Sequence, residues 1–183
     1  MRASHVHANL RSLELMGQDQ AQRVRDAVDP DVLRAIESAT RVAWLPVELD
    51  LELSEAVDRI LGPQALTDWS RLAMQDSFRG PLLGPVVDGA VRLFGLHPGR
   101  LAKVFPRGWT QIYRGCGDLK TEPSGGDSVR ISHVAPPELL RVSDVFHRSV
   151  AGAFSALFDV ARVRGEVSVV VLARHVDYTL NWR

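Results

Sequence analysis

Through the first two-thirds of the chain, apolar residues recur three or four positions apart, the spacing that gathers them on one face of an α-helix. Asp29-Pro30-Asp31 is typical of a helix start, because the first aspartate can accept from first-turn amides and the proline needs no amide partner. We expect helices over residues 7–16, 20–28, 30–39, 46–61, 66–80, 83–94 and 97–114, with a helix end near Gly80-Pro81 and an interruption at Pro106.

Beyond residue 117 the hydrophobic period changes from the helical to the extended one. A short polar segment, residues 118–123, and an alternating segment, residues 129–133, flank the turn-forming residues 124–127, so we expect a β-hairpin. A long helix is expected over residues 138–164, with apolar positions along one side. Small residues in this helix would let another backbone approach closely: Ala151, Gly152, Ala153 and Ala156.

Two further strands complete the chain. Residues 167–172 are apolar on both faces, which predicts a central strand covered on two sides, and residues 178–183 alternate cleanly. The order helices, hairpin, long helix, hairpin predicts an α+β fold with N-terminal helices packed on a four-stranded antiparallel sheet. We expect a single domain over residues 1–183, with a helical part at about 7–114 and a hairpin–helix–hairpin part at about 118–183.

Composition and charge narrow the class of partners. Lys+Arg and Asp+Glu each number 22, so the net charge is zero with neutral histidines, and we do not expect nucleic-acid binding. No stretch approaches the roughly 18 apolar residues of a membrane span. Cys116 is the single cysteine, which excludes an internal disulfide and a cysteine-built zinc cluster and fits a cytoplasmic location.

Four short segments resemble parts of a known family: Trp44-Leu45-Pro46 opening a helix, residues 98–115 with Trp109 and a closing Tyr113-Arg114-Gly115, the small-residue helix 150–160, and the final segment 178–183. Over nearly its whole length the chain thereby resembles a myxobacterial paralogous family of unknown function. The resemblance implies the topology of a superfamily that includes vinyl-reductase-type domains, haem–nitric oxide sensors and transport-particle subunits. It implies a shape rather than a reaction, because function resides in the sites that a fold carries.

The resemblance also implies what a haem sensor would need: an axial histidine on the helix before the first hairpin, and a Tyr-x-Ser-x-Arg motif for the propionates. This chain offers His97 at the start of that helix, and neither residues 113–117 nor residues 178–182 fit the motif. The vinyl-reductase type often carries cysteines near the last strands, whereas Cys116 is alone and lies far earlier. We therefore expect no cofactor, haem included, and no metal.

The remaining polar residues offer no catalytic set. Asp144 and His147 lie three positions apart, as a general base and its orienting carboxylate could, but a solvated helix flank is the favoured interpretation. His133 and His175 show no local metal-ligand spacing. Cys116, between two glycines, is expected to be exposed and inert. With no nucleophile elbow, phosphate loop or dinucleotide motif present, we do not expect an enzyme.

The large aromatic residues either fill a solid core or line an apolar cavity between helices and sheet. With a cavity, we expect a non-catalytic sensory or regulatory domain that binds a small apolar ligand through Trp109, Tyr113 and Phe146. The alternative is a protein-interaction module that acts by homodimerisation or by docking a partner protein, since small-residue and apolar helix faces are extensive and catalytic groups are lacking.

Overall fold

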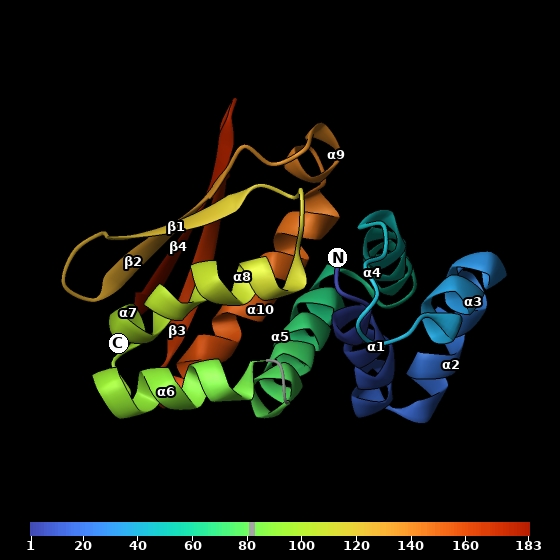
Figure 1. Ribbon diagram of the computed structural model, residues 1–183, viewed down its shortest axis with the longest axis horizontal. Helices are drawn as coiled ribbons and strands as arrows, with labels where there is room; N and C mark the ends of the chain where they lie inside the picture. The colour runs from blue at the N-terminus through green and yellow to red at the C-terminus, as the bar shows by residue number, and fades with distance from the viewer. Residues whose placement is uncertain (81–82) are drawn as a thin grey trace.

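The computed structural model describes residues 1–80 and 83–183 and confirms the predicted α+β class (Figure 1). In chain order the elements are α1 (Ala3–Ser12), η1 (Leu13–Met16), α2 (Gln18–Ala27), α3 (Pro30–Ser38), α4 (Glu48–Leu61), α5 (Pro63–Arg79), α6 (Gly84–Phe94), α7 (Pro98–Leu101), η2 (Ala102–Val104), α8 (Phe105–Ile112), β1 (Asp118–Pro123), β2 (Ser128–Val134), α9 (Glu138–Arg141), α10 (Asp144–Ala161), β3 (Gly165–Val171) and β4 (His175–Trp182). The helix end expected at Gly80-Pro81 lies partly outside the described residues. Among the helices that are described, none is long and apolar enough to cross a membrane.

The four strands form one antiparallel sheet in the order β1-β2-β4-β3. Along β2 and β4 every second residue is buried, and Ile131 lies opposite Tyr178 in the register that joins the two hairpins. The buried side chains contribute to the core, whereas the alternate residues, such as Arg130 and Thr179, face away from it. The sheet is therefore of the kind that covers the core with one face and meets water with the other.

The expectation of a central, doubly covered strand at residues 167–172 is wrong. β3 pairs only with β4 and forms an edge of the sheet, and the side chains of Val170 and Val171 are 53% and 46% exposed. A run of β-branched residues fits any pleated strand, so it does not by itself report the number of neighbours. Because the two hairpins join through β2 and β4, β3 is left at the margin.

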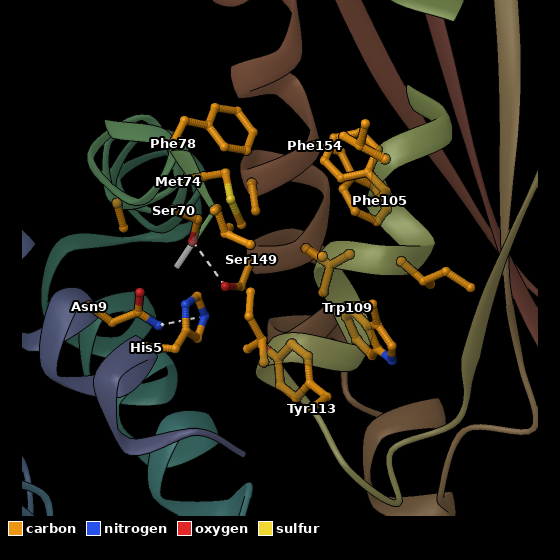
Figure 2. Close-up of a pocket in the computed structure, with 18 of the residues that line it drawn as sticks. His5, Asn9, Ser70, Met74, Phe78, Phe105, Trp109, Tyr113, Ser149 and Phe154 are labelled. Atoms are coloured by element: carbon orange, nitrogen blue, oxygen red, sulfur yellow. Dashed lines mark hydrogen bonds between the residues drawn. The ribbon is translucent and has the colours of Figure 1, made fainter. Parts of the chain in front are cut away.

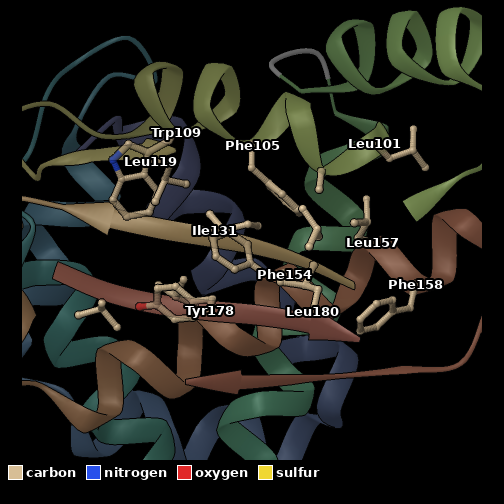
Figure 3. Packing of buried hydrophobic residues seen from close by; sticks show 14 of the residues in the cluster. Leu101, Phe105, Trp109, Leu119, Ile131, Phe154, Leu157, Phe158, Tyr178 and Leu180 are labelled. Atoms are coloured by element: carbon tan, nitrogen blue, oxygen red, sulfur yellow. The ribbon is translucent and has the colours of Figure 1, made fainter. Parts of the chain in front are cut away.

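Buried apolar residues form two clusters on opposite sides of α5. The first lies under the sheet, where Phe105 and Trp109 of α8 and Phe154 of α10 meet the inner side chains of β2 and β4 (Figure 3). The second joins α1 to α4 with α5, with Leu53 and Trp69 fully buried in it. Figure 1 shows α1 to α4 on one side and the sheet on the other, with α5 and α10 between them.

The helices α5 and α10 approach closely at Gly152, as the small residues of α10 predict. A Cβ atom placed on Gly152 would lie 2.4 Å from the carbonyl oxygen of Thr67 and 3.1 Å from the Cβ of Ser70. Nearby, the hydroxyls of Ser70 and Ser149 are hydrogen bonded at 2.9 Å. At one end of the contact, the Arg71 guanidinium holds the pKa of Asp159 below its usual value. The absence of a side chain at residue 152 therefore sets the separation of the two layers.

The expected long helix is divided. A turn at Val142, whose side chain is 60% exposed, separates the short α9 from α10. Ser143 begins α10 as its N-cap, with its hydroxyl accepting from the Phe146 amide at 3.1 Å. The helix ends at Arg162 in the left-handed conformation, before Gly165 starts β3. The apolar pattern predicted the face of this helix, but the capping serine determines where it begins.

Replacing Gly152 by alanine is expected to lower the free energy of unfolding by about 1–3 kcal/mol, because the added methyl group forces α5 and α10 apart. Gly89→Ala is the matched control: a Cβ at Gly89, in α6, would meet nothing within 4 Å, so this variant should gain about 0.4–1 kcal/mol. Urea denaturation of both variants measures the difference. A Gly152→Ala protein as stable as the parent would contradict the close approach.

Candidate ligand-binding cavity

A cavity of about 60 Å³ lies between α1 and α5 on one side and α8 and α10 on the other (Figure 2). A bound water needs about 10–15 Å³ of cavity volume, so the space corresponds to about four to six waters. Its described lining residues come from several segments between His5 and Phe154: His5, Asn9, Asp50, Trp69, Ser70, Ala73, Met74, Phe78, Leu83, Val86, Val87, Val104, Phe105, Gly108, Trp109, Ile112, Tyr113, Leu119, Ser149, Val150, Ala153 and Phe154. Most are apolar, as in sites for small organic molecules.

Aromatic side chains of α8 and α10 form the apolar wall. The rings of Phe105 and Phe154 lie 4.6 Å apart between centroids, and those of Trp109 and Tyr113 lie 4.1 Å apart. The Trp109 indole donates to the carbonyl oxygen of Gly117 at 2.9 Å, which fixes the orientation of its ring. The wall is thus a preorganised surface for an apolar molecule.

Polar side chains of α1 and α4 gather at the opposite end of the cavity. The Asn9 amide donates to Asp50 Oδ1 at 2.8 Å and lies 3.4 Å from His5 Nε2, so Nε2 is the acceptor nitrogen of the imidazole. Burial lowers the pKa of His5, which keeps the ring neutral, and burial raises the pKa of Tyr113, whose ring lies 6.0 Å from that of His5. The cavity therefore has an apolar wall and one polar end.

A third feature of the lining is the contact between α5 and α10. The bonded hydroxyls of Ser70 and Ser149 face the cavity between Met74 and Tyr113 in Figure 2. The Trp69 side chain also contributes to the lining, and its Nε1 has no hydrogen-bond partner within the described part of the chain. The same helix contact that is set by Gly152 therefore carries polar groups at the cavity.

Two of the three residues expected to bind a ligand, Trp109 and Tyr113, lie on the cavity wall. Phe146 is buried behind Trp109, with 6.5 Å between ring centroids, and does not belong to the described lining. Sequence reasoning missed His5 and Asn9, although their separation by four residues places both on one face of α1. It missed Asp50 as well, because a carboxylate inside an apolar helical stripe gives no sign of its partner.

Other polar candidates lie elsewhere. His147 is buried rather than solvated: its Nε2 donates to the carbonyl oxygen of Arg141 at 2.8 Å, and its Nδ1 lies 2.9 Å from the Tyr178 hydroxyl. The helix-flank interpretation of His147 is therefore wrong, because the residue faces the sheet. His97 is exposed and packs edge-on against Trp182, with 5.8 Å between centroids. Within residues 1–80 and 83–183, no group of three or more metal-ligating side chains is found.

Cys116 is buried, so the expectation of an exposed thiol is wrong. Burial raises the pKa of the thiol, which leaves it protonated and weakly nucleophilic. The backbone carbonyl of Cys116 accepts from His133 Nε2 at 2.6 Å, which ties the loop before β1 to β2. The sequence could not show this burial, because flanking glycines are as compatible with a tight, covered loop as with an exposed one.

No protein-family model and no curated protein sequence matches the chain, so the resemblance to the myxobacterial family stays a prediction. Solved structures do match. An Fe(II) unliganded H-NOX protein from K. algicida has a TM-score of 0.66 at 11% identity, with 100% of this chain and 97% of that chain covered. An oxygen-binding H-NOX domain related to soluble guanylate cyclases has a TM-score of 0.63 at 11% identity and covers 100% and 95%. A structure from work on heme distortion in the H-NOX family gives the same figures: 0.63, 11%, 100% and 95%. The shared property is the fold.

These neighbours contradict the expectation of no cofactor, because proteins with this fold are described with Fe(II) and heme. The expectation rested on the position of His97 and on the missing Tyr-x-Ser-x-Arg motif, whereas the cavity receives a different histidine, His5. A neutral imidazole is a suitable iron ligand. The described lining, however, holds no arginine or lysine for propionates, and a space for about four to six waters is far smaller than a porphyrin. The lining thus supplies a ligand atom but does not fit a whole haem as it stands.

Acidification is expected to destabilise the fold through its buried histidines. Burial lowers the pKa of His5 and of His133 from the ordinary value of 6.5, so the unfolded chain takes up protons that the folded chain does not. This contribution to the free energy of unfolding is complete above about pH 7 and falls towards about pH 5, by up to about 1.4 kcal/mol per pH unit for each histidine.

Urea denaturation across this pH range tests the expectation with two variants. His133→Gln should reduce the pH slope, because it removes one of the two groups. His97→Gln, at an exposed histidine, should leave the slope unchanged. A parent protein whose stability is constant or rises on acidification between pH 7 and 5 would contradict the assignment of neutral, buried imidazoles.

Proposed function

We propose that the chain is a non-catalytic sensory or regulatory domain that binds a small, largely apolar ligand in the cavity between α1, α5, α8 and α10. The observation that carries the proposal is the cavity itself, about 60 Å³ in volume with aromatic walls and one polar end. Protein interiors are close-packed and hold few voids larger than a water molecule. A space that holds several waters and is lined mostly by apolar atoms is the default site for an organic ligand.

The lining residues support binding rather than catalysis. Trp109, Phe105 and Phe154 provide apolar contact area, and Phe146 supports Trp109 from behind. Among the described lining residues, Ser70 bonds to Ser149, so neither hydroxyl is paired with a histidine that could activate it. An H-NOX protein of the same fold is described as oxygen-binding, which adds an analogy at the level of the fold.

Filling the cavity is expected to abolish ligand binding without unfolding the protein. Octan-1-ol serves as a neutral, slender probe, and its binding should raise the melting temperature in a concentration-dependent way. Ala153→Leu extends a side chain into the cavity from α10 and should remove this shift. Ala173→Leu, the same substitution at an exposed residue of the β3–β4 turn, should keep it.

Two results would contradict the proposal. One is a parent protein whose melting temperature does not respond to octan-1-ol, or responds equally in Ala153→Leu. The other comes from titrating hemin into the same sample and following its Soret absorbance. A stoichiometric Soret shift that is lost in His5→Gln would identify haem, not a small apolar molecule, as the occupant.

A protein-interaction function is the second candidate, and the edge strand β3 favours it. The opposite edge, β1, carries Asp118, Lys120 and Glu122 and ends in Pro123, the features by which edge strands avoid pairing with other chains. From Val167 to Val171, β3 carries no charge, and its outer valines are exposed. An uncharged edge of this kind can pair with the same edge of a second copy.

Under this second candidate, the protein should form a dimer whose fraction rises with concentration in sedimentation or light scattering. Val170→Lys places a charge on the edge and should yield a monomer. Leu15→Lys is the matched control, because Leu15 is 59% exposed on the helical side of the molecule and should leave the dimer intact. A parent protein that stays monomeric at high concentration would exclude homodimerisation.

A further inference from the structure

A second cavity of about 90 Å³ lies beside the first, and charged side chains are among those that line it. One of its walls is a face of α1, where Ser4, His7 and Arg11 recur at helical spacing. Arg41 completes this wall, and its backbone carbonyl accepts from the Ser4 amide at 3.1 Å, which holds the residue beside α1. Arg11 and Arg41 thus reach the lining of one cavity from separate segments of the chain.

The charges of this second cavity favour an anion. Neither Arg11 nor Arg41 has an ion-pair or side-chain hydrogen-bond partner within the described residues, whereas Arg71 and Arg148 are paired with carboxylates. Asp76 of α5 also lines the cavity, so the lining holds two cations and one carboxylate. Arginine presents a planar set of donors that matches the two oxygens of a carboxylate.

The two cavities share part of their lining. His5 and Leu83 border both of them, so the polar end of the apolar cavity adjoins the arginine-lined one. A molecule with an apolar body against Trp109 and Phe154 would direct its other end past His5 towards Arg11 and Arg41. The apolar site and the arginine-bearing site thus adjoin each other at His5 and Leu83.

We propose that the ligand is an amphipathic carboxylic acid, with its apolar part in the aromatic cavity and its carboxylate between Arg11 and Arg41. This inference rests on the proposed function, because it assumes that the first cavity is the binding site. It adds the chemical class of the ligand and two residues that select it. Neutral molecules of the same length are then bound more weakly, since they leave the two guanidinium groups without a partner.

The test compares octanoate with octan-1-ol by calorimetric titration of the whole chain. The parent protein should bind octanoate more tightly than octan-1-ol. Added sodium chloride should weaken the binding of octanoate and leave the binding of octan-1-ol unchanged. Arg11→Gln and Arg41→Gln should each raise the dissociation constant of octanoate by about tenfold and leave that of octan-1-ol unchanged. Asp76→Asn should strengthen the binding of octanoate, because it removes the carboxylate that lines the cavity with the two arginines.

The outcomes separate this inference from the proposed function. If octan-1-ol binds and octanoate binds no better, or if the arginine variants weaken both probes equally, the carboxylate site is overturned and the apolar cavity remains. If neither probe binds the parent protein, both proposals fail. Arg11 and Arg41 are exposed, so their substitution should leave the fold intact. An unchanged melting temperature without ligand verifies this for each variant and separates a loss of binding from misfolding.

Discussion

The close contact of α5 and α10 is the constraint on which the other features depend. Gly152 lets the Thr67 carbonyl of α5 reach the α10 backbone, and the hydroxyl pair Ser70–Ser149 joins the same two helices. α10 carries the sheet on its other side, while α5 carries the helices α1 to α4. The separation of the two apolar clusters therefore depends on the absence of a side chain at Gly152. The cavity is the space beside this helix contact that α1 and α8 enclose.

Local patterns predicted the elements well where a single neighbour decides the outcome. The alternation of β4, the Asp29 cap and the small residues of α10 are each explained by a contact within a few residues or by one packed face. The position of β3 was mispredicted because strand order depends on how two hairpins join, and a run of valines is compatible with a centre or an edge. His147 was mispredicted for a similar reason, since its partner Tyr178 lies 31 residues away.

The cavity shows the same limit of sequence reasoning. Trp109 and Tyr113 were accessible to it because they lie four positions apart, one on the short helix α8 and the other at its C-cap. His5, Asn9 and Asp50 were not, because they meet that helix only after α1 has packed on α5 and Asn9 has bonded to Asp50 of α4. Polar groups brought together from distant segments therefore define the character of the site, while the local pattern defines only its apolar wall.

The four tryptophans offer the most direct measurement of where a ligand binds. Trp69 and Trp109 line the cavity, whereas Trp44 lies between the guanidinium groups of Arg2 and Arg114 and Trp182 packs on His97. In a ¹H–¹⁵N spectrum of the labelled protein titrated with octan-1-ol, the account predicts shifts of the Trp69 and Trp109 indole signals alone. Shifts confined to Trp44 and Trp182, or no shift of any indole, would contradict it.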